Sequence, residues 1–175
     1  MTNAVKKGIL AFMFPLLVAN TLLSQTFNSG FENQTEGKKE WSAYGNDASR
    51  VSYPAEAAKS GKVGLKIVSP EGTPTQLFSL PNVLPIAMEA GKKYKLTYWV
   101  KPVEKGWGVK FSVYEGSFKK ETGIELDFST KKMKGNDWQQ MSMTFTGNAM
   151  AKGKISITAN RGTYLIDDVQ IVEQK

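Results

Sequence analysis

The 175-residue sequence contains no histidine and no cysteine. The missing histidine excludes catalytic sets with an imidazole base, such as a Ser-His-Asp triad, and the absence of both residues excludes zinc or haem sites built on them. Without cysteine the chain forms no disulfide. Arginine is scarce, since Arg50 and Arg161 are the only two among 23 basic residues. The formal net charge of +7 therefore comes mainly from lysine.

The composition is that of one folded domain. A chain of this length is enough for one domain of ordinary size and too short for two such domains. Apolar residues make up 41% of the sequence and charged residues 22%. Such a chain can bury a hydrophobic core and is not a disordered tail.

The first 24 residues have the layout of a secretory signal peptide. Lys6 and Lys7 precede a continuous apolar stretch over residues 8–19, and a short polar segment follows. The alternative is a membrane anchor, but a span needs about 20 apolar residues. We predict that residues 1–24 are removed near Ser24 and that residues 25–175 form the mature domain. The protein would then be secreted, periplasmic or attached to the cell surface, with no membrane span left.

The mature chain has the two-residue hydrophobic period of β-strands. Residues 94–101 show it clearly, because Tyr94, Leu96, Tyr98 and Val100 fall on one face. Similar alternation occurs over residues 109–114, 140–145 and 155–160. Glycine-containing turn signals separate these stretches roughly every dozen residues in the second half, which favours an all-β sandwich.

Two segments do not follow the strand pattern. Residues 55–59 are compatible with a short helix or a loop, and residues 116–134 predict a long hairpin or excursion.

Six local strings in order resemble the carbohydrate-binding modules of families four, nine and twenty-two. They are Asn28-Ser29-Gly30-Phe31-Glu32, Trp41, the glycine-containing string at 60–67, the strand string at 91–101, Trp138-Gln139-Gln140 and Tyr164-Leu165-Ile166-Asp167-Asp168-Val169. The resemblance covers nearly the whole mature chain and implies a galactose-binding-domain-like jelly roll, that is, a β-sandwich of two antiparallel sheets. Function inferred from fold is an analogy.

The same resemblance implies a structural calcium ion. By match, its ligands are Glu32 and Asp167, with Asp168 as the less favoured partner. Calcium takes hard oxygen ligands in a flexible cage, so the residue types are suitable. The alternative is that Glu32 and Asp168 are solvated turn residues.

Recognition of a sugar needs an exposed aromatic ring beside polar groups. Trp41 and Trp138 match structural tryptophans of the resembled family, and we expect them to be buried. Trp99 instead points away from the expected core, together with Lys101. If residues 109–114 form the neighbouring antiparallel strand, Lys110 and Tyr114 join the same face.

We therefore predict a carbohydrate-binding patch made of Trp99, Tyr114, Lys101 and Lys110, flanked by Trp107. The alternative for Trp99 is burial under residues 116–134. The lysine-rich surface would favour an acidic glycan. With arginine scarce, no binding motif and export predicted, we expect no nucleic-acid partner. We expect a monomer.

Three functions stay open at this point. We favour non-catalytic binding of a polysaccharide or oligosaccharide over catalysis, because the adjacent acids Asp167 and Asp168 would point to opposite faces of a strand. The first alternative is a structural or adhesive surface protein of the same fold without a sugar site. The second is a small polysaccharide-degrading enzyme, which needs two carboxyl groups across a cleft.

Overall fold

The computed structural model describes residues 25–34, 39–104, 106–129 and 133–175. The predicted signal peptide, residues 1–24, lies outside this part of the chain. Among the described residues, none of the helices has the length and apolar character needed to span a membrane.

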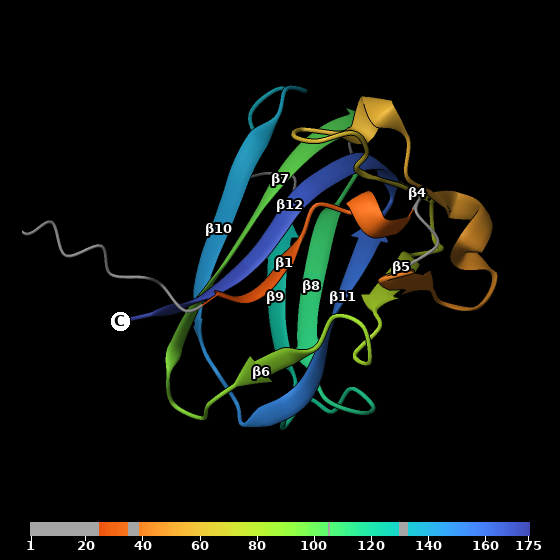
Figure 1. Ribbon diagram of the computed structural model, residues 1–175. Helices are drawn as coiled ribbons and strands as arrows, with labels where there is room; N and C mark the ends of the chain where they lie inside the picture. Colours follow the sequence, from red (N-terminus) through yellow and green to blue (C-terminus); the bar gives the residue numbers. More distant parts are fainter. Residues whose placement is uncertain (1–24, 35–38, 105, 130–132) are drawn as a thin grey trace, which may run out of the picture.

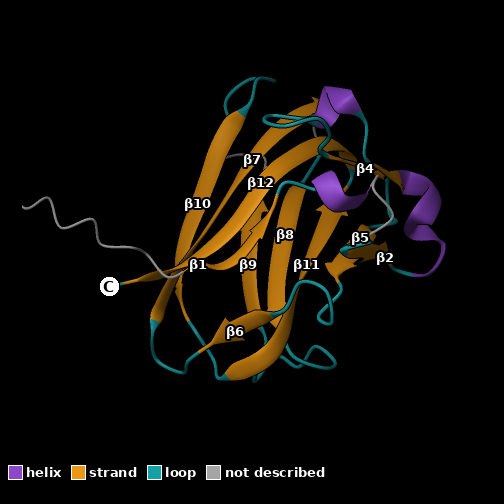
Figure 2. Ribbon diagram, in the orientation of Figure 1, coloured by secondary structure: helices purple, strands orange, loops and turns teal. Residues whose placement is uncertain are grey.

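The molecule is a sandwich of two six-stranded sheets (Figures 1 and 2), in which every strand pair is antiparallel. Sheet A has the order β10 (Gln139–Thr146), β7 (Lys93–Glu104), β12 (Gly162–Gln174), β4 (Leu65–Ser69) and β3 (Val51–Ser52), and β1 (Gln25–Ser29) also pairs with β12. Sheet B has the order β2 (Trp41–Ala43), β5 (Thr75–Ser79), β11 (Met150–Asn160), β8 (Gly108–Tyr114) and β9 (Ile124–Ser129), and β6 (Ile86–Met88) also pairs with β11. The predicted all-β sandwich of two antiparallel sheets is confirmed.

In the described part of the chain, three short 3₁₀ helices lie in the connections. They are η1 (Glu32–Gln34), η2 (Gly45–Arg50) and η3 (Ala55–Ala57). Residues 55–59, for which the sequence is compatible with a short helix or a loop, thus contain η3. Residues 116–134 contain β9, which pairs back onto β8 and so forms a long hairpin.

The core lies between the two sheets and follows the predicted alternation. On β7, Tyr94, Leu96, Tyr98 and Val100 are at most 2% exposed, and each residue between them is partly buried. Burying a large apolar side chain stabilises a fold by roughly 1.5–3 kcal/mol. A two-residue pattern of this kind therefore specifies which face of the strand points inward.

The two sheets meet through aromatic contacts. The rings of Tyr98 on β7 and Phe111 on β8 have centroids 4.5 Å apart across the interior. Trp41 is 2% exposed, packs on Phe31 with centroids 5.2 Å apart, and donates from Nε1 to Ser29 Oγ at 2.9 Å. Its predicted burial is confirmed, whereas Trp138 is only partly buried.

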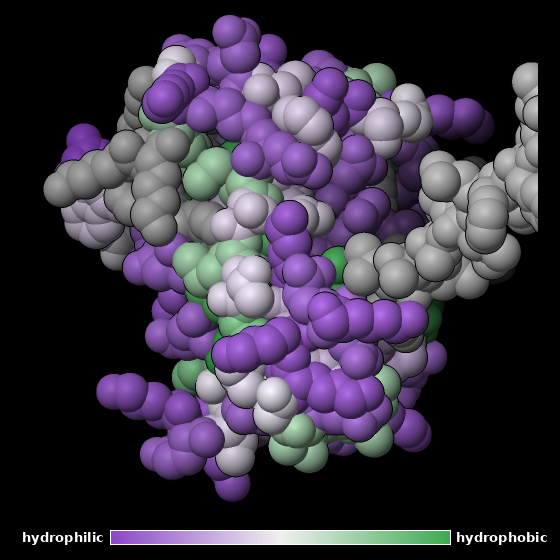
Figure 3. Space-filling view, turned by 90° about the vertical axis from the view of Figure 1, so that its left-hand side faces the viewer, coloured by the Kyte–Doolittle hydropathy of each residue, from purple (hydrophilic) through white to green (hydrophobic). Residues whose placement is uncertain are grey.

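The outside of the sandwich is largely polar. Seen from the side on which β10 lies, the surface is mainly hydrophilic, with a narrow zone of hydrophobic residues between the polar ones (Figure 3). The polar side chains of alternate strand positions thus face solvent, as a two-layer sandwich requires.

Candidate functional site

The structure divides the predicted aromatic patch between the two sheets. Trp99 and Lys101 lie on β7 of sheet A, whereas Lys110 and Tyr114 lie on β8 of sheet B. The expectation that β8 is the antiparallel neighbour of β7 is therefore wrong. β7 pairs with β10 and β12, and β8 pairs with β11 and β9. The alternation on both strands was read correctly, but the chain crosses from one sheet to the other between them.

Trp99 lies on the outer face of sheet A and is partly buried there. Its strand neighbours are Gln140 on β10 and Asp167 on β12. The ammonium group of Lys59 lies 4.7 Å from the centre of its ring. Such a cation–π contact stabilises by about 0.5–1 kcal/mol at an exposed site. Trp99 thus has a partner from its own chain on the side that a sugar would occupy.

The outer face of sheet B carries a grid of polar and aromatic side chains. The inward residues of its strands, among them Leu77, Phe111, Leu126 and Ile157, are at most 3% exposed, so the residues between them point outward. We call this outer surface the sheet B face; it consists of Gln76, Phe78, Lys110, Ser112, Tyr114, Glu125, Asp127, Lys154, Ser156 and Thr158.

The strand register sets these side chains in rows. One row runs Phe78, Ser156, Ser112 and Glu125 across β5, β11, β8 and β9. The next row runs Gln76, Thr158, Lys110 and Asp127. Because directly opposed residues have Cβ atoms about 4.5–5.5 Å apart, each row forms one continuous strip of side chains.

A hollow of ≈ 340 Å³ lies over these rows. Its lining comes from four strands of the face, β5, β8, β9 and β11, and from Phe118, which follows β8 and is 37% exposed. The rings of Tyr114 and Phe118 meet edge to face, with centroids 5.4 Å apart. Tyr114 is only 8% exposed beside this contact. It therefore does not form the open stacking surface that the sequence predicted, and it lines the wall of the hollow instead.

Charged groups of both signs lie around this hollow. Lys110 Nζ pairs with Glu125 Oε1 at 3.3 Å. Lys154 Nζ lies 4.9 Å from the ring centre of Tyr114 and 5.2 Å from that of Phe78. The ion pair holds the Lys110 side chain against Glu125, and Lys154 lies beside the two rings.

Two hydroxyl groups lie deeper in the wall. Burial raises the pKa of Tyr114, and the approach of the Ser156 hydroxyl partly offsets this rise. Ser156 is fully buried, and its Oγ makes no hydrogen bond of acceptable geometry within the described part of the chain. A buried hydroxyl in that state can accept or donate to a ligand without losing an existing partner.

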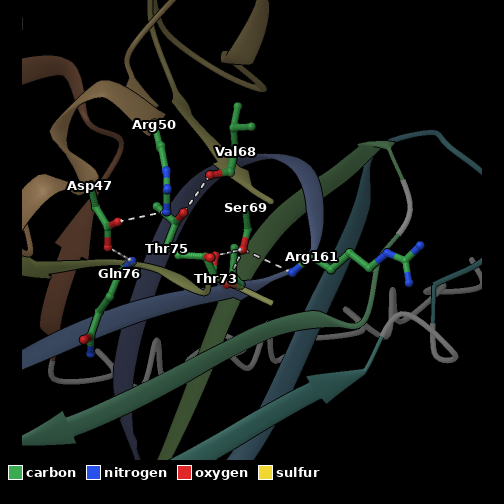
Figure 4. Close-up of polar contacts among 9 residues, drawn as sticks. Asp47, Arg50, Val68, Ser69, Thr73, Thr75, Gln76 and Arg161 are labelled. Carbon is green, nitrogen blue, oxygen red and sulfur yellow. Dashed lines mark hydrogen bonds and ion pairs between the residues drawn. The ribbon is translucent and has the colours of Figure 1, made fainter. Parts of the chain in front are cut away.

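The edge of the sheet B face next to β5 is fixed by η2 (Figure 4). Asp47 Oδ2 accepts a hydrogen bond from the backbone nitrogen of Gln76 at 2.9 Å, and Asp47 Oδ1 pairs with Arg50 at 3.4 Å. The side chain of Gln76 is left free to line the hollow.

The predicted calcium ligands approach one another at the end of β1. A Cβ atom built on Gly30 would lie 3.7 Å from Asp168 Oδ1, 3.8 Å from Asp167 Oδ1 and 4.0 Å from Glu32 Cγ. Their oxygens face backbone donors, however. Asp167 Oδ2 accepts from the amides of Lys59 and Ser60 at 2.7 and 3.0 Å.

Glu32 is bound in the same way. Its Oε1 accepts from the amides of Lys62 and Val63 at 2.9 and 3.3 Å. In the described residues no group of three or more acidic, histidine or cysteine side chains is arranged to hold a metal ion. The Glu32 and Asp167 carboxylates hold the 59–63 loop through its amides, and the calcium ion stays a prediction from the resemblance.

Sequence reasoning placed Lys110, Ser112 and Tyr114 on one outer face and missed the members of the sheet B face that lie on β5, β9 and β11. Phe78, Ser156 and Thr158 alternate with buried residues on their own strands, which was visible in the sequence. Their meeting depends on β11 lying between β5 and β8. This strand order joins residues about 80 positions apart in the chain, as the pair Phe78 and Ser156 shows, and no local pattern indicates it.

Comparison with known proteins gives one family. The model of a family described as "Carbohydrate binding domain", grouping modules of families 4 and 9, matches residues 23–162. A search of curated proteins finds no match.

Solved structures share the fold at low sequence identity. The CBM22-1 xylan-binding domain of Xyn10C from Paenibacillus barcinonensis is 18% identical with a TM-score of 0.57, over 87% of this chain and 96% of that one. The CBM22-1-GH10 modules of Xyn10B from Clostridium thermocellum, complexed with xylohexaose, are 18% identical with a TM-score of 0.56, over 86% of this chain and 29% of that one.

Proposed function

Because the match over residues 23–162 shows that the chain belongs to the carbohydrate-binding domain family of modules 4 and 9, we propose that it binds a polysaccharide or oligosaccharide through the sheet B face, without catalysis. The observation that carries this proposal is the hollow of ≈ 340 Å³, whose lining combines aromatic rings with polar side chains, among them the Ser156 hydroxyl, which has no hydrogen-bond partner in the described residues. It lies across the strands of a rigid sheet and needs no rearrangement of the backbone.

The chemistry of the hollow suits a sugar chain. A pyranose ring presents apolar C–H groups on its faces and hydroxyl groups at its edge. Phe118 offers apolar surface in the lining, and Phe78 offers more beside it, next to Ser156 in its row. Four other lining residues supply groups that both donate and accept hydrogen bonds, namely Gln76, Ser112, Ser156 and Thr158. Sites for small ligands combine apolar walls with a few placed polar groups in this way.

The charges of the sheet B face favour a neutral glycan. Two lysines, Lys110 and Lys154, stand against two acids, Glu125 and Asp127, and Lys110 is already paired with Glu125. The acidic preference that the net charge suggested is not supported on this face. An acidic glycan would instead suit the outer face of sheet A, where Lys59 lies over Trp99 and Lys101 lies on β7 with Trp99.

A catalytic role of the face is disfavoured by the placement of its acids. Glu125 and Asp127 are both exposed and sit two residues apart on β9, the edge strand of sheet B. They do not face each other across a cleft, as the two carboxyl groups of a glycosidase do. Export by a signal peptide over residues 1–24 is part of this proposal, because it would bring the domain to extracellular polysaccharides.

The test is binding to defined polysaccharides. Electrophoresis in gels containing soluble xylan, β-glucan, galactan or polygalacturonate would show which of them retards the protein, and calorimetry with hexasaccharides would give affinities. Xylan is tested first because one similar structure is described as a xylan-binding domain and another as complexed with xylohexaose. We expect at least one neutral polysaccharide to retard the protein.

Two substitutions locate the site. Phe78→Ala removes a ring beside Lys154 and should weaken binding at least about tenfold, equivalent to ~1.4 kcal/mol. Glu125→Gln breaks the pair with Lys110 and should change affinity in the same assay. The matched control is Gln140→Ala on the outer face of sheet A, which should bind like the wild type.

The outcomes separate the alternatives. If no polysaccharide retards the wild type, the sheet B face is not a glycan site and the adhesive or structural function takes its place. If reducing ends appear after incubation with a polysaccharide, the protein is an enzyme. If Gln140→Ala loses binding as Phe78→Ala does, the site is not confined to sheet B.

A further inference from the structure

Trp107 is highly exposed and lies outside the hollow of the sheet B face. It sits in the turn between β7 and β8 and is 63% exposed. Beside it lies a second hollow of ≈ 290 Å³, formed with Pro70 and Pro74 of the β4–β5 turn and with Asn160 and Arg161 of the β11–β12 turn. Three turns at one end of the sandwich thus surround a single concave surface.

Backbone contacts hold these turns in place. The amide of Trp107 donates to the Asn160 carbonyl at 2.9 Å. A Cβ atom on Gly106 would collide with the Arg161 carbonyl, so the two turns approach as closely as a glycine permits. The hollow is therefore preorganised before any ligand arrives.

Arg161 is held in an unusual backbone conformation. Its φ of 53° lies in the left-handed region, which a residue with a side chain rarely adopts. Its amide donates to Ser69 Oγ at 3.1 Å, and in Figure 4 its side chain extends away from this cluster. Backbone strain fixed by its surroundings is common where a side chain must be presented for binding.

The polar rim of the hollow carries a charge pair. Arg161 Nη1 lies 3.0 Å from Glu71 Oε1, and the two side chains are 47% and 70% exposed. Guanidinium groups donate and carboxylates accept, so together they can bind two neighbouring hydroxyl groups of a sugar. Because Glu71 already neutralises Arg161, the rim favours a neutral sugar over a uronic acid.

This hollow adjoins the sheet B face. Thr158 lines the first hollow and Asn160 lines the second, on the same side of β11. Two residues along a strand span about 7 Å. A sugar chain lying in the first hollow can therefore place a further ring beside Trp107.

We propose that the Trp107 hollow is an end subsite that holds one neutral pyranose ring of a longer glycan, stacked on the indole of Trp107 and hydrogen-bonded by Arg161 and Glu71. The inference rests on the proposed binding of a glycan to the sheet B face. It predicts a dependence on chain length, because a short oligosaccharide fills the first hollow without reaching the indole.

The experiment is calorimetry with the tri- and hexasaccharides of xylan, β-1,4-glucan and β-1,4-galactan, using the full chain. Trp107→Ala should weaken hexasaccharide binding about three- to tenfold and leave trisaccharide binding unchanged. Tyr44→Ala is the matched control, because Tyr44 is similarly exposed, at 66%, and does not line either hollow. Phe78→Ala should weaken both chain lengths.

A charge substitution tests the neutral preference. Glu71→Gln frees Arg161, and binding of hexagalacturonate should then strengthen relative to the wild type. Unchanged binding of hexagalacturonate would overturn the assigned role of the Arg161–Glu71 pair.

The two proposals fail separately. If the wild type binds none of the six neutral sugars or the acidic one, glycan binding itself fails and the subsite with it. If the wild type binds but Trp107→Ala matches it at both lengths, the subsite is wrong while the sheet B face stands. An equal loss for tri- and hexasaccharides in Trp107→Ala would also overturn the end position.

Discussion

The hydroxyl of Tyr164 donates a 2.9 Å hydrogen bond to the carbonyl of Arg161. The same hydroxyl accepts from the amides of Gly106 and Gly108 at 3.2 and 3.0 Å. One buried phenol on β12 thereby joins the β11–β12 turn to the turn that carries Trp107. The shape of the Trp107 hollow depends on this side chain.

Tyr164→Phe should therefore weaken both the fold and the end subsite. The substitution removes the three hydrogen bonds that the phenol makes to the turns, and loss of hydrogen bonds to buried groups costs about 1–3 kcal/mol. Urea unfolding measures the stability, and hexasaccharide calorimetry measures the subsite. Tyr94→Phe is the control, because the Tyr94 hydroxyl accepts from the backbone amide of Glu89 at 2.8 Å in another part of the fold. If both variants bind hexasaccharide alike, the hydrogen bonds of the Tyr164 hydroxyl do not shape the Trp107 hollow.

Trp99→Ala should bind neutral glycans as the wild type does, because Trp99 lies on the outer face of sheet A, away from both hollows. Gel retardation by the neutral polysaccharide that binds the wild type checks this expectation, with circular dichroism to verify folding. If a folded Trp99→Ala protein lost binding of the neutral polysaccharide, the binding site would lie on sheet A and not on the sheet B face. Polygalacturonate in the same assay tests the lysines around Trp99.

Alkaline pH should destabilise the protein through Tyr98. Burial raises the pKa of Tyr98 well above its ordinary value. As the pH passes about 10, the phenol ionises in the unfolded chain and stays protonated in the folded one. The unfolded state then binds fewer protons, so the free energy of unfolding falls as the pH rises.

Tyr98→Phe keeps a ring against Phe111 and removes the titrating group. Its free energy of unfolding should fall less than that of the wild type between about pH 9 and pH 11. Urea unfolding at several pH values gives the change of the free energy of unfolding with pH for the wild type and for Tyr98→Phe. Identical slopes would mean that Tyr98 makes no contribution to the alkaline loss.

The calcium prediction is tested by thermal unfolding with chelator and with added ion. We expect EDTA to lower Tm, calcium to restore it and magnesium to do so poorly, because Mg²⁺ demands a tighter octahedral cage. An ion at 100 times its Kd would stabilise the fold by about 2.7 kcal/mol. Glu32→Gln should lose the response to calcium. A Tm that ignores both EDTA and calcium would leave the 59–63 amides as the partners of Glu32 and Asp167.

The sequence predicted the strands and their inward faces well, because alternation is local. Tyr94, Tyr98, Phe111 and Ile157 are all in the core. It could not predict which strands are neighbours. Whether the chain after β7 turns back beside it or crosses to the other sheet depends on contacts such as Tyr98 with Phe111, which join the two layers. The predicted patch was divided for this reason.

The burial of individual aromatics was predicted in part. Trp41 is buried against Phe31, as its match to the family implied. Tyr114 faces outward as its strand position indicates, but Phe118 covers it. That contact comes from a loop whose path no periodic pattern describes.

Strand β12 has a consequence for how the protein is made. Its residues 162–174 pair with β1, β4 and β7, whose members begin at residues 25, 65 and 93. Sheet A therefore cannot form its central strand, β12, until the residues after 162 have been synthesised. Until then β1, β4 and β7 lack their common partner. Pairings this distant in sequence form slowly. Delayed assembly of this kind would be compatible with the export proposed above, in which the chain crosses a membrane before it folds.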